Sequence, residues 1–152
     1  MKKTISIVAA CFVIIGLFGV SCKKLGMKDL GYVNVSANNC YQAYVKKKGG
    51  DIVLWFQVFD NIDDKAVLAS YKNVADKVEN YPAKIYKDKW IWLLIKDRME
   101  IRLIADDKAK EFQNTDELKK FIKSFDLEGM AKVTGPKMKA KDMEKFIPKL
   151  GQ

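Results

Sequence analysis

The sequence predicts a single α+β domain, built from a mainly antiparallel sheet of about four strands with helices packed mainly on one face. Two observations predict this class. The segment 52–59 is strongly apolar, β-branched and aromatic, and three further short strand-like segments follow within 83–105. Segments with helical spacing of apolar residues lie before, between and after these strands. Residues 32–152 are long enough for one such domain and too short for two of ordinary size.

The first element of the domain, at 36–48, has two interpretations. Its apolar residues recur at helical spacing, which favours a helix capped by Ser36 and ended by the glycine pair 49–50. The alternative is a strand over 41–45, joined to the next strand by a hairpin through 48–50. We take the helix as the prediction. Its apolar positions are Ala37, Cys40, Tyr41, Tyr44 and Val45.

The segment 52–59 is apolar on both alternating faces, which predicts a central strand covered on both sides. The acidic run 60–64 then begins a helix rather than a calcium loop, because Ile62 and Lys65 stand where such a loop needs an oxygen ligand and a glycine. Helical spacing predicts that this helix continues to about residue 78. Its apolar stripe, which Pro82 follows, comprises Val67, Tyr71, Val74, Ala75 and Val78.

Three strands are predicted in succession at 83–86, 90–95 and 99–105, separated by short polar turns. The last strand alternates, so one face enters the core while Glu100 and Arg102 lie on the exposed face and form a surface ion pair. Its core-facing residues are Met99, Ile101, Leu103 and Ala105. The tryptophans Trp55, Trp90 and Trp92 are interpreted as core residues, and the alternative is an aromatic platform on which sugars or nucleotides stack.

The C-terminal third predicts two amphipathic helical pieces. Asn114 or Thr115 caps a helix that carries Glu117 near the positive end of its dipole. Its apolar stripe consists of Leu118, Phe121, Ile122 and Phe125. The last piece has apolar residues Met143, Phe146, Ile147 and Leu150, faced by Lys141, Lys145 and Lys149. We interpret it as a helix that closes the core, and the alternative is a lysine surface that lies on an anionic membrane or on a partner.

The N-terminal segment has the order of a secretory signal: a basic start at 2–3, an apolar stretch at 5–20, then small residues. The apolar stretch is shorter than the roughly 20 residues that span a bilayer, and lysines follow it at once. Residues 1–21 are therefore predicted to be a signal peptide, and 22–31 a short tether.

The tetrad Gly19-Val20-Ser21-Cys22 resembles the lipobox of bacterial lipoproteins, although that family prefers leucine where Gly19 stands. The resemblance implies cleavage between Ser21 and Cys22 and acylation of Cys22, with palmitate-type chains that hold the protein in the lipid bilayer. Lysines at 23–24 replace the aspartate that retains many Gram-negative lipoproteins at the inner membrane, so the outer membrane is the expected location. The sequence does not choose between its periplasmic and outer faces.

The inventory of reactive side chains is short. The chain has no histidine, and after loss of the signal only Cys22 and Cys40 remain as cysteines, so we expect no metal or other cofactor. With Cys22 acylated, Cys40 is either buried or pairs between chains, and burial is the prediction. The net charge of +9 comes almost entirely from lysines spread along the chain, which favours a solvated surface and no nucleic-acid partner.

These observations favour a non-catalytic, membrane-anchored lipoprotein that binds an envelope protein or an extracellular partner. One alternative is a cell-wall hydrolase using paired carboxylates, which requires two carboxylates about 5–9.5 Å apart in a cleft. The other is a structural accessory subunit of an envelope complex.

Overall fold

The computed structural model describes residues 30–36 and 40–150 of the chain, so the signal peptide, the lipobox and most of the tether lie outside the described residues. Its centre is a seven-stranded sheet in the order β1-β2-β3-β7-β6-β5-β4, in which every neighbouring pair is antiparallel. The strands are β1 (Leu30–Asn34), β2 (Cys40–Lys47), β3 (Ile52–Asp60), β4 (Lys77–Val78), β5 (Tyr81–Tyr86), β6 (Trp90–Ile95) and β7 (Met99–Ala105). The mixed α and β composition and the antiparallel sheet are confirmed, but the sheet has seven strands rather than four.

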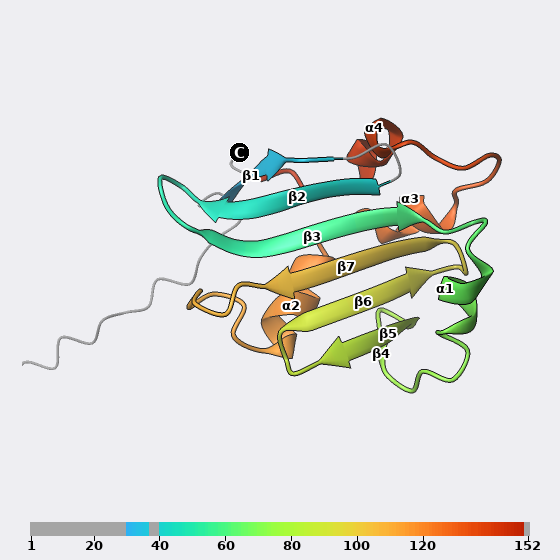
Figure 1. Cartoon of the computed structure of the whole chain (residues 1–152), viewed down its shortest axis with the longest axis horizontal. Helices are drawn as coiled ribbons and strands as arrows, with labels where there is room; N and C mark the ends of the chain where they lie inside the picture. Colours follow the sequence, from blue (N-terminus) through green and yellow to red (C-terminus); the bar gives the residue numbers. More distant parts are fainter. Residues whose placement is uncertain (1–29, 37–39, 151–152) are drawn as a thin grey trace, which may run out of the picture.

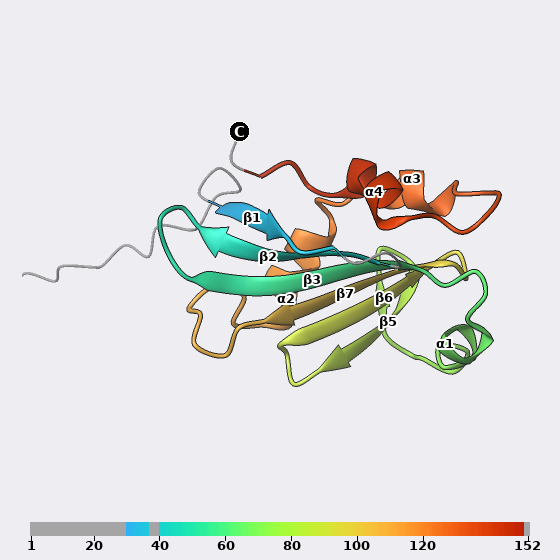
Figure 2. The same cartoon turned by 45° about the horizontal axis from the view of Figure 1, so that its top comes forward.

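The helices are short. They are α1 (Lys65–Ala69), α2 (Thr115–Ile122), α3 (Leu127–Ala131) and α4 (Ala140–Met143), with a 3-10 turn at Glu144–Phe146. In Figure 1, α2 and α3 lie behind the sheet, α4 stands at its upper edge beyond β2, and the near face is open. Figure 2 shows α3 and α4 on one side of the sheet and α1 on the other side, at one end. We call the helix-covered side the covered face and the other side the open face.

The hydrophobic core fills the space between the covered face and α2–α4. Alternate residues of the central strands enter it, and the prediction for β7 is confirmed, because Met99, Ile101, Leu103 and Ala105 are all buried. Rings from α2 and the turn after it dock on β3: the Phe56 centroid lies 6.2 Å from that of Phe121 and 5.3 Å from that of Phe125. Asn114 caps α2, as predicted, by accepting a hydrogen bond from the Glu117 amide.

The helix prediction for 36–48 is wrong, and the strand alternative is correct for the described part of this segment. Residues 37–39 lie outside the described residues, and β2 begins at Cys40. Tyr41, Ala43 and Val45 are buried in alternation, which is a period of two rather than 3.6. The burial predicted for Cys40 is confirmed. A glycine with positive φ, Gly49, allows the hairpin into β3.

The long helix predicted after residue 64 is also wrong. Asp64 does cap a helix, accepting from the Val67 amide at 3.0 Å, but α1 ends at Ala69. The chain then runs to β4, and the turn at 79–80 pairs Val78 with Tyr81. Both turn residues have positive φ, a conformation that suits a two-residue hairpin.

The C-terminal piece closes the core, as expected. Met143, Phe146 and Ile147 are buried against the covered face, although the helix is only a single turn before it becomes 3-10. Gly129 lies inside α3, where its amide donates to the Asp126 cap.

Candidate binding face

The open face carries a continuous row of apolar and aromatic side chains that crosses six strands. Strand register places these residues side by side, in the order Val33, Tyr44, Trp55, Ile104, Trp90 and Tyr86. We call this set the aromatic row. With neighbouring strands about 4.8 Å apart, the row is roughly 24 Å long.

The aromatic row is accessible to solvent. Trp90 and Tyr86 are each 42% exposed, and Trp55 and Tyr44 are half-buried. The rings support one another: the Tyr44 and Trp55 centroids are 6.4 Å apart at an interplanar angle of 26°, and those of Tyr86 and Trp90 are 6.3 Å apart. The prediction that Trp55, Trp90 and Trp92 are core residues is wrong, because all three lie on the open face. The predicted covering of 52–59 on both sides fails for the same reason.

A second row runs beside the first, two residues along each strand. Its members, which we call the arginine row, are Gln42, Gln57, Arg102, Trp92 and Lys84. The Gln57 amide donates to the Gln42 side-chain oxygen at 3.0 Å, and the Lys84 ammonium contacts the Ser70 hydroxyl at 2.6 Å. The open face thus offers flat apolar rings next to hydrogen-bonding groups.

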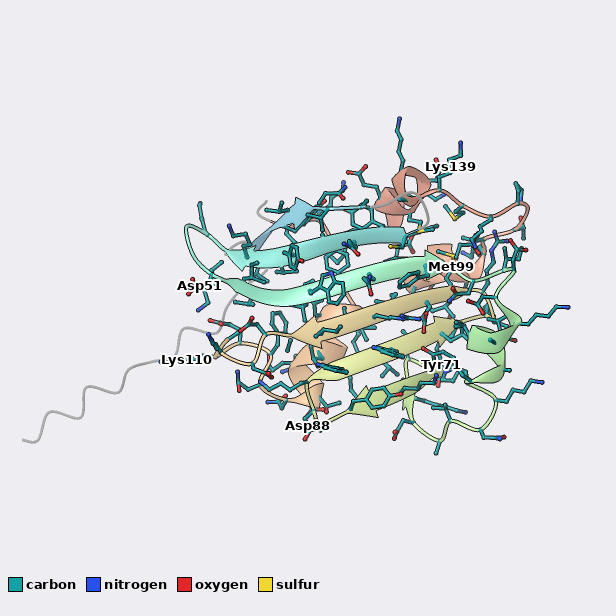
Figure 3. All side chains as sticks on the ribbon, in the orientation of Figure 1. Asp51, Tyr71, Asp88, Met99, Lys110 and Lys139 are labelled. Atoms are coloured by element: carbon teal, nitrogen blue, oxygen red, sulfur yellow. The ribbon has the colours of Figure 1, made fainter. Side chains whose placement is uncertain are left out.

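Glu100 holds one member of the arginine row, Arg102, from the neighbouring open-face position of the same strand. The predicted ion pair with Arg102 is confirmed, at 2.8 Å, but Glu100 is fully buried rather than exposed. One carboxylate oxygen accepts from the Tyr71 hydroxyl at 2.6 Å, and the other from Asn61 at 3.1 Å and from Arg102 Nε and Nη2. Figure 3 places Tyr71 at the α1 end of the open face. Burial, together with the charge of Glu100, raises the pKa of Tyr71, so its hydroxyl stays protonated as a donor.

Arg102 is held by Glu100 and by two aromatic rings. Its guanidinium carbon lies 4.5 Å from the ring centroids of both Phe59 and Trp92. Of the five N–H groups of a guanidinium, Arg102 uses one on Nε and one on Nη2 for Glu100. Within 30–36 and 40–150, the other three have no acceptor, and the side chain is 24% exposed.

The residues singled out from sequence lie elsewhere. Cys22 and Ser21 are outside the described residues. Lys141, Lys145 and Lys149 are exposed on the segment that packs on the covered face, so they are not part of the open face, and their role as an interaction surface stays a prediction. Sequence reasoning missed Tyr44, Tyr86 and Lys84 as members of the site. Alternation along the strands could have found them, because each shares a face with the tryptophans or glutamines of the same sheet.

Neither a metal centre nor a membrane span is found in the described part of the chain. No group of three or more Cys, Asp or Glu side chains there is arranged to hold a metal ion. No described helix is long and apolar enough to cross a bilayer.

Fold and face together define a small single-domain α+β protein with an open, aromatic sheet face. Comparison with known proteins finds no matching family model and no significant match among curated proteins or solved structures.

Proposed function

We propose that the protein is a lipid-anchored lipoprotein of the bacterial envelope, without catalytic activity, whose open face binds a linear saccharide chain. The lipobox-like tetrad ending at Cys22 supports the anchor. The anchor acts through acyl chains, each contributing about 0.8 kcal/mol per buried CH₂, and two or more chains make the attachment stable.

The observation that carries the binding role is the pairing of the two rows. A saccharide ring has an apolar C–H face, which stacks on aromatic rings, and hydroxyl groups at its edge, which need donors and acceptors. The aromatic row supplies the rings for stacking. Gln42, Gln57 and Lys84, which lie two residues further along the strands, supply the donors and acceptors for the hydroxyl groups. Because the aromatic row runs straight across six strands, it suits an extended polymer rather than a single small molecule.

The composition of the open face separates this ligand from the alternatives. A nucleic acid requires several free cations for its phosphates, but the charge of Arg102 is partly offset by Glu100, which leaves few on this face. A peptide that binds as an added strand gains most of its affinity by pairing with a strand edge. The aromatic row instead lies across the middle of the sheet, where the strands are already paired.

Trp90→Ala tests the binding role, because Trp90 is exposed and its removal leaves the core intact. Stacking of a nucleobase on one aromatic side chain contributes about 1–3 kcal/mol. Taking a similar range for the C–H face of a sugar ring, we expect the affinity for purified cell-wall glycan to fall on the order of tenfold. Affinity is measured by co-sedimentation and by quenching of tryptophan fluorescence. Ile62→Ala, an exposed apolar residue outside both rows, is the matched control and should bind as wild type.

Two results would contradict the binding role: equal affinity of Trp90→Ala and wild type, or wild-type binding to nucleic acid or protein through this face with none to any saccharide. The anchor has its own test. Cys22→Ser should abolish fatty-acid labelling and processing, and unchanged labelling would remove the anchor from the proposal.

A further inference from the structure

We infer that the saccharide bound on the open face carries carboxylate groups, and that Arg102 and Lys84 bind them. This inference rests on the proposed function and narrows its ligand from saccharides in general to acidic ones. Arg102 is thereby a specificity-determining residue, while the aromatic row supplies affinity.

The first argument is the preorganisation of Arg102. Two N–H groups fixed on Glu100 and two rings at 4.5 Å on either side leave the guanidinium little freedom. Its outer edge, formed by Nη1 and the second hydrogen of Nη2, has no acceptor among the described residues. Such an edge matches a carboxylate with two parallel hydrogen bonds, and because the side chain is already ordered, binding loses little conformational entropy.

The second argument is charge. Lys84 Nζ lies 4.1 Å from the Tyr71 ring centroid and 5.8 Å from that of Trp92, so Arg102 and Lys84 flank the same indole. Glu100 offsets one of the two positive charges, and it lies buried two residues from Arg102 on the same strand, where Asn61 and Tyr71 bond to it. The surface therefore presents a net positive site to a ligand, which complements an anion.

The third argument is the separation of the rows. Residues two apart on a strand are about 6.8 Å apart, with both side chains on one face. A sugar ring that stacks on the aromatic row therefore directs a carboxylate on its own edge toward the arginine row. A phosphodiester that links two sugars lies in the polymer backbone instead, above the aromatic row and away from Arg102.

The test uses the mature lipoprotein in mild detergent with polygalacturonate and its methyl ester, which share a backbone and differ in the charge of the carboxyl group. Wild type should bind the acid form at least tenfold more tightly than the ester. Arg102→Lys keeps the positive charge but removes the two parallel N–H donors of the guanidinium. The ratio of acid to ester affinity should therefore fall toward one, while the affinity for the ester is unchanged. Lys84→Gln should lower the ratio by a smaller factor, and Lys141→Gln, an exposed lysine on the covered side, should leave it unaltered.

Equal wild-type affinity for acid and ester, or tighter binding of polyphosphate than of polygalacturonate, would overturn the inference. A second outcome would also overturn it: Lys84→Gln leaves the ratio of acid to ester affinity unchanged, and Arg102→Lys either leaves that ratio unchanged or fails to fold. These failures differ from failure of the proposed function, in which Trp90→Ala and wild type bind cell-wall glycan equally.

Discussion

The two arginines of this chain stand four positions apart, and each pairs with a buried carboxylate. Arg98 binds Asp60 through Nε at 3.0 Å and Nη2 at 2.7 Å, and it also donates to the carbonyl oxygens of Gly135 and Pro136. The Met138 amide completes the cluster by donating to Asp60 at 2.8 Å. This arginine ties the turn before β7 to the segment that leads into α4.

Arg102 differs because only one edge of its guanidinium is used. It bonds to Glu100, and rings of Phe59 and Trp92 cover its two flat sides. Its side chain is 24% exposed, compared with 10% for Arg98. The guanidinium of Arg98, engaged along both edges by protein groups, fastens the fold, whereas that of Arg102 is held along a single edge and its other edge has no acceptor among the described residues.

Arg98→Ala should produce the largest effect, because it leaves Asp60 buried without its counter-charge. Breaking a buried pair in this way destabilises a protein by about 3–5 kcal/mol, measured here as the free energy of unfolding in urea. The matched control is Lys137→Ala, an exposed lysine in the segment that Arg98 fastens, which should change stability by less than about 0.5 kcal/mol. If Arg98→Ala lowers the free energy of unfolding by less than about 1 kcal/mol, Arg98 does not fasten the fold and the contrast with Arg102 fails.

Tyr71→Phe should have an intermediate effect. It removes the hydroxyl that donates to Glu100 and leaves one buried carboxylate oxygen without that partner, at a cost of about 1–3 kcal/mol. Tyr86→Phe removes an exposed hydroxyl from the aromatic row and is expected to leave the unfolding free energy unchanged. If the two variants are equally stable, Glu100 does not depend on Tyr71.

The smallest expected effect is the loss of stability that accompanies protonation of Asp60 at acid pH. Burial alone raises the pKa of Asp60, but hydrogen bonds from Arg98 and from the Met138 and Ile62 amides outweigh burial and lower it below its ordinary 3.8. The resulting stabilisation is present above pH 3.8 and is lost as the pH falls through the lower folded pKa.

Urea unfolding of wild type and Asp60→Asn at several pH values measures this effect. The stability gap between the two proteins should be constant near neutral pH and should narrow below about pH 4. Asp63→Asn, at an exposed carboxylate, should track wild type throughout, and a gap that stays constant into strong acid would disprove the lowered pKa.

The strands within 83–105 could be predicted because their periodicity is local and polar turns separate them. The cap at Asn114 could also be predicted from local sequence, because its side chain bonds to an amide only three residues further on. The segment 36–48 could not, because Tyr41 and Val45 fit both a helical and an alternating pattern. Pairing with β1 and β3, which is a tertiary effect, decides in favour of the strand.

The candidate site was harder to predict, because parity places Trp90 and Trp92 on one face without showing which face the helices cover. That choice depends on where α2, α3 and α4 pack. Glu100 shows the same difficulty, since alternation directed it away from the core, but the segment that contains Asn61 and Tyr71 covers it locally. Neither contact leaves a periodic trace in the sequence.

The strand order has a consequence for how the molecule assembles. β1–β3 and β4–β7 are each made of strands adjacent along the chain, and the two groups meet only where β3 pairs with β7, from Leu54 opposite Ala105 to Asp60 opposite Met99. Because this pairing closes a longer loop than the hairpins on either side of it, we expect it to form after them during folding. Both rows of the open face cross the pairing of β3 with β7. A chain in which only one of the two groups has formed therefore lacks a complete aromatic row, and under the proposed function it could not yet bind the saccharide.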